Sequence, residues 1–276
     1  MSRLLTGPAA RIHAVDRGDG DPVVLVHGWS MSHEPWAATV DDLVAAGHRV
    51  IAVDLRGHGR SDAPDDDGGY ALDDLAGDVL ALLRARDVPP ATVVGWSLGG
   101  MVSVRLAALA PDRVDRIVLV ASNGVAHARS AAFPFGMEPD VTIDAVESAE
   151  RADRVAGRRA VLAGGFGDRP DPDALERLLR VSLGTDPRAE AGCLRTLLRT
   201  HQVDLLPDGL PVTQILGDRD RTVSRRGGDW VVSQIPGAVQ VALPCGHYPM
   251  IEAPDAFHAA LRRAVHHELH PDGRTD

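Results

Sequence analysis

One serine of this chain stands in a setting that can turn its hydroxyl into a nucleophile. Ser97 is the centre of Gly95-Trp96-Ser97-Leu98-Gly99, which follows a short β-branched run and precedes a helical pattern over residues 101–110. The two glycines permit a turn too sharp for larger side chains, and such a turn holds a serine at a helix N-terminus, where a developing anion is stabilised. We therefore predict a strand, a strained turn and a helix, with Ser97 as the catalytic nucleophile.

A serine hydroxyl needs a general base to accept its proton. Among the 12 histidines, His247 is the best placed, because Pro244-Cys245-Gly246-His247 lies between the last predicted strand and the final helix. If His247 is the base, turnover of a reactive ester should rise through a single ionisation near neutral pH. Seven other histidines are expected to be surface or core residues: His13, His58, His127, His201, His266, His267 and His270.

The base in turn needs a carboxylate that orients its ring. Two candidates follow a single predicted strand, in Leu216-Gly217-Asp218-Arg219-Asp220. Asp218 would point back near the strand end, whereas Asp220 lies past the turn and can reach across to the histidine loop. We favour Asp220 as the orienting acid and interpret Asp218 as a carboxylate that orders the loop or pairs with an arginine.

Attack on a carbonyl carbon also requires N–H donors for the oxyanion. The N–H of Leu98 directly follows the nucleophile, and the second donor is expected in the loop after the first buried strand. There, His27-Gly28-Trp29 offers the N–H of Trp29, and Gly28 lets this backbone approach closely. The Trp29 side chain can at the same time be a core aromatic or line the pocket.

The elements that must position these residues alternate between strands and helices. Continuous apolar runs at 22–26, 49–54 and 114–120 are typical of strands buried on both faces, and helical patterns separate them. Strand patterns resume at 212–216 and 239–243. We predict an α/β fold with a mostly parallel sheet that helices cover on both faces.

The alternation is interrupted by a helical block rich in arginine and alanine. We predict that residues 122–206 form a helical cap inserted into a core domain made of residues 1–121 and 207–276. The cap should lie over the carboxyl ends of the strands, where parallel sheets place their sites. Four cap side chains can line an acyl pocket, although packing between cap helices explains them as well: Phe133, Phe135, Met137 and Phe166.

Composition excludes several classes of function. A formal net charge of -10, with no lysine in the chain, argues against nucleic acid as a partner. No apolar run is long enough to span a bilayer, and the N-terminus lacks the apolar region of a signal peptide, so a cytoplasmic location is expected.

Cys193 and Cys245 have neither metal nor redox spacing and are expected to be reduced packing residues. We expect a small-molecule substrate, no metal and no cofactor; the oligomeric state is not predicted.

The motifs occur in an order that resembles the α/β-hydrolase fold superfamily. Besides the serine turn, the resemblance includes Asp54-Leu55-Arg56-Gly57-His58-Gly59-Arg60-Ser61 and Gly246-His247. It implies an eight-stranded sheet and a Ser97–Asp220–His247 triad. Trp96 beside the nucleophile resembles some carboxylesterases, including pimeloyl-carrier-protein methyl ester esterases, and also cofactor-free haloperoxidase and perhydrolase relatives. The serine argues against the dehalogenase and epoxide hydrolase branches, which use an aspartate.

We therefore expect a bacterial serine hydrolase that cleaves a carboxylic ester or thioester of a small to medium, partly apolar acyl group. The same triad can perform non-hydrolytic chemistry if the cap excludes water, such as cyclisation, acyl transfer, lyase chemistry or perhydrolysis. A further alternative is a ligand-binding protein without catalysis, although such a receptor has no need of a placed Asp220.

Overall fold

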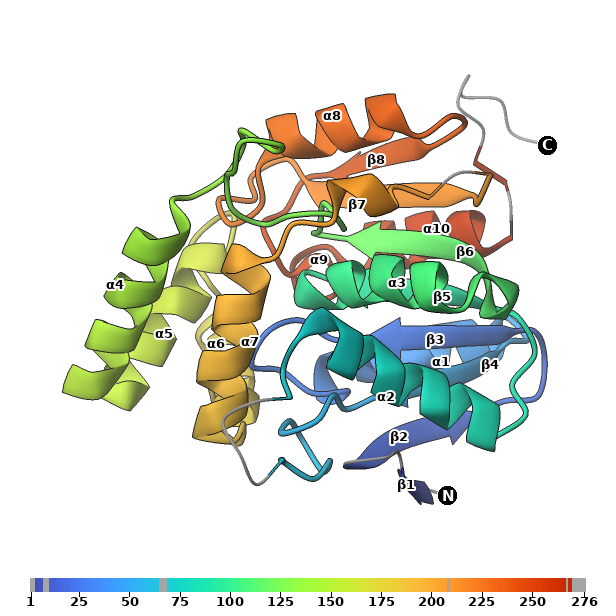
Figure 1. Cartoon of the computed structure of the whole chain (residues 1–276), viewed down its shortest axis with the longest axis horizontal. Coiled ribbons are helices and arrows are strands. Elements are labelled where there is room, and N and C mark those ends of the chain that lie inside the picture. Colours follow the sequence, from blue (N-terminus) through green and yellow to red (C-terminus); the bar gives the residue numbers. More distant parts are fainter. Residues whose placement is uncertain (1–2, 7–9, 65–68, 208, 267, 270–276) are drawn as a thin grey trace.

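The computed structural model describes residues 3–6, 10–64, 69–207, 209–266 and 268–269. Eight strands form one sheet in the order β1-β2-β4-β3-β5-β6-β7-β8 (Figure 1). The pairs β1–β2 and β2–β4 are antiparallel, and all pairs from β4 to β8 are parallel. The strands are β1 (Arg3–Thr6), β2 (Arg11–Arg17), β3 (Pro22–Val26), β4 (Arg49–Val53), β5 (Ala91–Trp96), β6 (Val114–Val120), β7 (Val212–Gly217) and β8 (Val239–Leu243).

Both faces of the sheet are buried at its central strands, β3 to β7, as the continuous apolar runs predict. In β3, Val23 and Leu25 pack into one hydrophobic cluster, and Val24 and Val26 pack into the other, because successive side chains point to opposite faces. Helices α2 (Leu72–Ala85), α3 (Leu98–Leu109) and α8 (Arg225–Gln234) contribute to the cluster on one face. Helices α1 (Ala37–Ala45), α9 (Pro249–Glu252) and α10 (Pro254–Val265) contribute to the other.

Four helices lie between β6 and β7, beyond the carboxyl ends of the parallel strands (Figure 1, left). They are α4 (Pro139–Ala152), α5 (Arg154–Gly165), α6 (Pro172–Leu183) and α7 (Pro187–Arg199). Aspartates start three of them: the side chains of Asp153, Asp171 and Asp186 accept N–H groups of the first helical turn. These helices fall inside the predicted cap, and the division into a core domain and a cap of residues 122–206 stays a prediction.

The local predictions hold for most of the core and fail at two places. Helix α8 is absent from the sequence-based prediction, since its Arg-Arg-Gly-Gly start shows no apolar periodicity. The final helix, for which the sequence pattern predicts residues 255–269, ends at Val265. Among the residues described, no helix is both long and apolar enough to cross a membrane.

The two cysteines are buried and unpaired, as expected for packing residues. Burial raises the pKa of each thiol, Cys193 and Cys245, to about 12. Neither sulfur is therefore a thiolate near neutral pH, and the reactive form of cysteine is the thiolate.

Candidate active site

The serine turn has the strained geometry that its sequence predicts. Ser97 links β5 to α3 with φ 53° and ψ -114°, a conformation that non-glycine residues rarely adopt. A Cβ at Gly99 would collide with the carbonyl oxygen of Val26, so only glycine lets α3 approach β3 this closely. The Ser97 N–H donates to the Val120 carbonyl at 3.0 Å, which fixes the turn against β6. Packing and hydrogen bonds thus hold Ser97 in its strained conformation at the N-terminus of α3.

Asp220 and His247 are brought together by the loops that follow β7 and β8. Their Oδ2 and Nδ1 atoms lie 2.8 Å apart, and the Asp220 side chain is 2% exposed. The other oxygen, Oδ1, accepts the N–H groups of Thr222 at 2.7 Å and Val223 at 3.1 Å. Burial alone would raise the Asp220 pKa, but His247 and these N–H donors lower it below its ordinary value, so the carboxylate stays ionised.

The structure separates the two candidate acids by position. Asp218 is half exposed and lies 3.4 Å from the guanidinium of Arg219, as expected for an arginine-paired carboxylate. Asp220, two residues further along the chain, reaches His247 instead, because the turn after β7 points it across to the loop that follows β8.

The histidine loop is fixed from three sides. The indole N–H of Trp96 donates to the His247 carbonyl at 3.0 Å, and the His247 N–H donates to the carbonyl of Gly165, the last residue of α5, at 2.7 Å. The Glu252 carboxylate accepts the N–H groups of Gly246 and Tyr248 at 3.1 and 3.0 Å. Trp96, next to the nucleophile, thus also anchors the predicted base.

Ser97 and His247 line the same cavity, whose volume is about 70 Å³. Most of its other walls are apolar side chains from the loop after β3 and from the cap. The lining residues are Gly28, Trp29, Met31, Trp96, Ser97, His127, Val161, Leu162, Leu197, Thr222, His247 and Tyr248. The predicted nucleophile and base are therefore accessible from one small, mainly apolar space.

The predicted oxyanion donors flank the serine. Leu98 is the first residue of α3, and Trp29 lies in the loop after β3 and lines the cavity. Gly28 runs so close to the serine that a Cβ on it would lie 3.2 Å from the Ser97 Cβ. The assignment of the Leu98 and Trp29 N–H groups to the oxyanion stays a prediction.

The four cap side chains expected in the pocket do not line this cavity. Phe133 and Phe135 pack instead on Trp230 of α8, with ring centroids 5.7 and 6.2 Å away. Phe166 packs on Tyr248, which lines the cavity, with ring centroids 4.8 Å apart. The Met137 carbonyl accepts the N–H of Arg129 at 3.0 Å, next to an isolated β-bridge between Ala128 and Met137.

The cavity beside Ser97 therefore gives no support to the expectation that these four residues line an acyl pocket. An apolar residue between β6 and β7 indicates burial without specifying the partner. The wall of this cavity includes instead Val161 and Leu162 of α5 and Leu197 of α7.

His127, expected to be a surface or core residue, lies in the cavity wall. It is 6% exposed, and burial, followed by the nearby His247, lowers its pKa to about 4. His127 is therefore neutral near pH 7. The signal in the sequence that could have indicated this is its position shortly after β6, whose carboxyl end lies at the same edge of the sheet as Ser97.

A second buried cluster has a structural explanation. The Asp54 carboxylate lies 2.9 Å from the ring nitrogens of both His13 and His33, and it also accepts the N–H groups of His33 and Arg60. Of the described residues, these two histidines and Asp54 are the group whose atoms are spaced to hold a metal ion. Each carboxylate oxygen already has two donors, so the cluster ties the loop after β3 to the loop after β4.

None of the other histidines that the structure describes lines the cavity beside Ser97. The His58 ring lies 5.0 Å from the His27 ring and the His266 ring 4.9 Å from the His48 ring, each pair in a tilted arrangement. His201 is half-buried beyond the end of α7. His267 and His270 lie outside the described residues.

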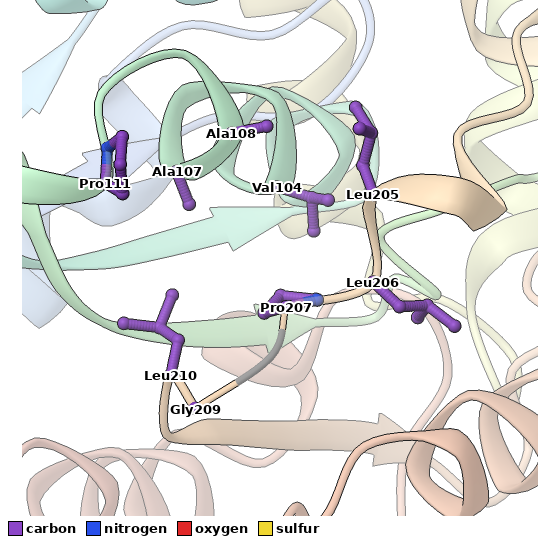
Figure 2. Close-up of a pocket in the computed structure, with 9 residues that line it drawn as sticks. All are labelled: Val104, Ala107, Ala108, Pro111, Leu205, Leu206, Pro207, Gly209 and Leu210. Atoms are coloured by element: carbon purple, nitrogen blue, oxygen red, sulfur yellow. The ribbon is translucent and has the colours of Figure 1, made fainter.

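A larger hollow, of about 450 Å³, lies between α3 and the segment that leads into β7 (Figure 2). Figure 2 shows Val104 and Ala107 of α3 facing Pro207 and Leu210 across it. None of the described residues that line it is a predicted site residue or carries an ionisable side chain. The predicted nucleophile and base line the smaller cavity beside Ser97 instead.

Comparisons with known proteins agree with this fold. The profile of the family described as alpha/beta hydrolase fold matches residues 21–142. A pimeloyl-[acyl-carrier protein] methyl ester esterase of Nitrosomonas europaea is 32% identical over 271 residues, covering 90% of this chain and 97% of that protein. A non-heme chloroperoxidase of Streptomyces lividans is 37% identical over 169 residues, 60% of each chain. The crystal structure of a bromoperoxidase from Bacillus anthracis superposes with a TM-score of 0.87 at 28% identity, covering 93% of this chain and 96% of that one.

Proposed function

The chain belongs to the α/β-hydrolase fold superfamily, and from that premise we propose that it is a serine hydrolase of carboxylic esters or thioesters with a short, apolar acyl group. The observation that carries the proposal is the 2.8 Å contact between Asp220 and His247 beside a serine on a strained turn. The likeness to an esterase over nearly the whole chain supports ester cleavage.

The mechanism follows from the roles of these groups. His247 takes the Ser97 proton as the oxygen attacks the ester carbonyl, and Asp220 holds the imidazole so that Nδ1 keeps its proton and Nε2 is the base. The N–H groups of Leu98 and Trp29 stabilise the oxyanion. Collapse releases the alcohol or thiol, which takes the proton from His247. Water activated by the same histidine then cleaves the acyl-enzyme.

The size of the cavity supports a short acyl group. Pockets for drug-sized ligands measure roughly 300–1,000 Å³, whereas the space beside Ser97 measures about 70 Å³. Leu162 and Leu197 of the cap form part of its wall, so the predicted cap would limit the length of the acyl chain.

A second candidate function is perhydrolysis. It is favoured by the likeness to the chloroperoxidase and the bromoperoxidase. In this reaction hydrogen peroxide replaces water: one peroxide oxygen bonds to the acyl carbon, the Ser97 ester bond breaks, and a peracid leaves. The site needs no additional residue for this step, since His247 accepts the peroxide proton and returns it to Ser97.

The test combines active-site labelling with turnover. The intact mass of wild type and of Ser97→Ala is measured after incubation with a fluorophosphonate, and p-nitrophenyl esters are assayed from acetate to decanoate. We expect one adduct on wild type, none on the variant, and turnover that is highest for acetate to butyrate. Absence of an adduct would refute the serine nucleophile and leave a non-catalytic binding protein as the better explanation.

Two further readouts separate the remaining alternatives. An adduct without ester turnover would favour cyclase, lyase or transferase chemistry. Peracid formed when hydrogen peroxide is added to the acetate assay, at a rate above that of hydrolysis, would favour perhydrolysis. A maximum at long acyl chains would contradict the short-acyl assignment alone.

A further inference from the structure

Arg158 is a fully buried arginine to which the mechanism above assigns no role. It lies in α5 of the cap, its side chain is 0% exposed, and its guanidinium carbon lies 4.6 Å from the centre of the Trp29 ring. A cation over an indole face is attracted by the ring quadrupole, and the attraction strengthens when water is excluded. The cap therefore holds a charge directly against the residue predicted to supply an oxyanion donor.

The Arg158 guanidinium is fixed by polar partners on several elements. Its Nε and Nη2 atoms donate to Glu150 Oε1 at 2.8 and 2.6 Å, and Nη2 also forms an ion pair with Glu190. Its Nη1 atom donates to the hydroxyl oxygens of Ser30 and Ser182. The planar fork of a guanidinium makes such simultaneous contacts possible, and a lysine ammonium cannot reproduce them.

The same cluster holds the loop after β3 at a second point. The Trp29 indole N–H donates to the Glu190 carbonyl at 2.8 Å. The next residue, Ser30, is fully buried and has φ 55°, a strained value for serine that persists only where the surroundings enforce it. Its hydroxyl is one of the atoms that bind Arg158. Cap contacts thus fix two consecutive residues of the predicted oxyanion loop.

The charges of the cluster are nearly balanced. Burial, together with a hydrogen bond to Glu190, raises the pKa of Glu150 to about 7, so Glu150 is partly protonated at neutral pH. Arg154 also pairs with Glu190, at 3.0 Å, from the cap surface. A buried cluster of this kind is strongly destabilised when one partner is removed, which makes it a rigid support.

We propose that Arg158 is a positioning residue, which holds Trp29 so that its main-chain N–H points at the oxyanion. This inference rests on the proposed function, since it assigns Trp29 to the oxyanion. Helix α5 also carries Val161 and Leu162, which line the acyl cavity. Helix α5 therefore limits both the volume available to the acyl group and the position of an oxyanion donor.

The test compares Arg158→Met with Arg159→Met. Arg159 is the next residue of the same helix, its side chain is 41% exposed, and it pairs with Glu176 at the surface, so this variant has the same change of charge and helix propensity. Removal of one oxyanion donor typically costs roughly 10²–10³ in rate. Because a displaced donor loses part of this effect, we expect kcat of Arg158→Met on p-nitrophenyl acetate to fall about 10- to 100-fold, with KM changed less than about threefold.

A transition-state analogue separates positioning from a general structural role. A short alkyl boronic acid forms a tetrahedral adduct with Ser97 whose oxygen occupies the oxyanion site. Its affinity should fall in Arg158→Met by the same factor as kcat/KM, and Arg159→Met should retain both values within about twofold. Unchanged kcat and boronate affinity in Arg158→Met would overturn the proposal.

A second variant covers the case in which Arg158→Met does not fold. In the double variant Arg158→Met/Glu150→Gln, the carboxylate of Glu150, which would lose its hydrogen bonds to Arg158, is replaced by a neutral amide. Glu190 retains its ion pair with Arg154. It is expected to fold and to show the same loss of kcat, and full activity would refute the positioning role. Wild type that neither labels at Ser97 nor turns over esters would instead refute the proposed function, and this inference with it.

Discussion

Replacing Asp220 by asparagine should slow ester turnover by about four orders of magnitude without unfolding the chain. Asp220 Oδ1 accepts two main-chain N–H groups, from Thr222 at 2.7 Å and Val223 at 3.1 Å, while Oδ2 lies 2.8 Å from His247 Nδ1. The asparagine oxygen must take the Oδ1 position, because an amide NH₂ there would face two donors. The NH₂ group then points at His247 Nδ1 and forces the ring proton onto Nε2.

The size of the effect follows from this tautomer. With a proton on Nε2, His247 cannot accept the Ser97 proton, and the corresponding change in another serine triad lowers kcat by roughly 10⁴. That factor equals about 5 kcal/mol in activation free energy. The isosteric amide preserves packing, so we expect the free energy of unfolding to change by less than about 2 kcal/mol.

The assay is kcat/KM for p-nitrophenyl acetate, with urea unfolding followed by circular dichroism as a check on folding. Asp218→Asn is the matched control, because it makes the same change two residues away on an exposed carboxylate, and it should retain wild-type activity within about twofold. A loss of less than tenfold in folded Asp220→Asn, or an equal loss in both variants, would refute the role given to Asp220.

Two other changes test the supports of the site. Trp96→Phe removes the 3.0 Å bond to the buried His247 carbonyl and should destabilise the fold by about 1–3 kcal/mol and lower kcat; unaltered urea unfolding would contradict this. Burial lowers the pKa of His58 to about 3, so the chain gains a proton at this histidine when it unfolds at acid pH. The contribution of neutral His58 to the free energy of unfolding is therefore complete above about pH 6.5 and is lost as the pH falls toward 3. Between pH 7 and 5 this loss is on the order of 2 kcal/mol and should be absent in His58→Asn, which urea unfolding at both pH values can measure.

Features that depend on neighbouring residues were predictable from the sequence. The strand, serine turn and helix around Ser97 follow from two glycines and from a change in apolar periodicity, and the structure has this turn with φ 53°. The continuous apolar runs identified the parallel strands, since burial on both faces removes the usual alternation. The order of the loops after β7 and β8 also limited the acid to Asp218 or Asp220 and favoured His247 as the base.

Features that depend on packing between distant segments were not predictable from the sequence. Whether an apolar cap residue lines the site is decided by how the cap helices rest on the core, and this packing turns Phe133 toward Trp230 while it places His127 in the cavity wall. The stacking of Arg158 on Trp29 joins residues that lie on different elements and share no local pattern. Most of the secondary structure of the core, apart from α8, and the residue types proposed for the chemistry were thus readable from the sequence, because turn geometry and burial periodicity act over a few residues. The size of the cavity and the residues that wall it required the tertiary structure, because both arise from contacts between segments far apart in the chain.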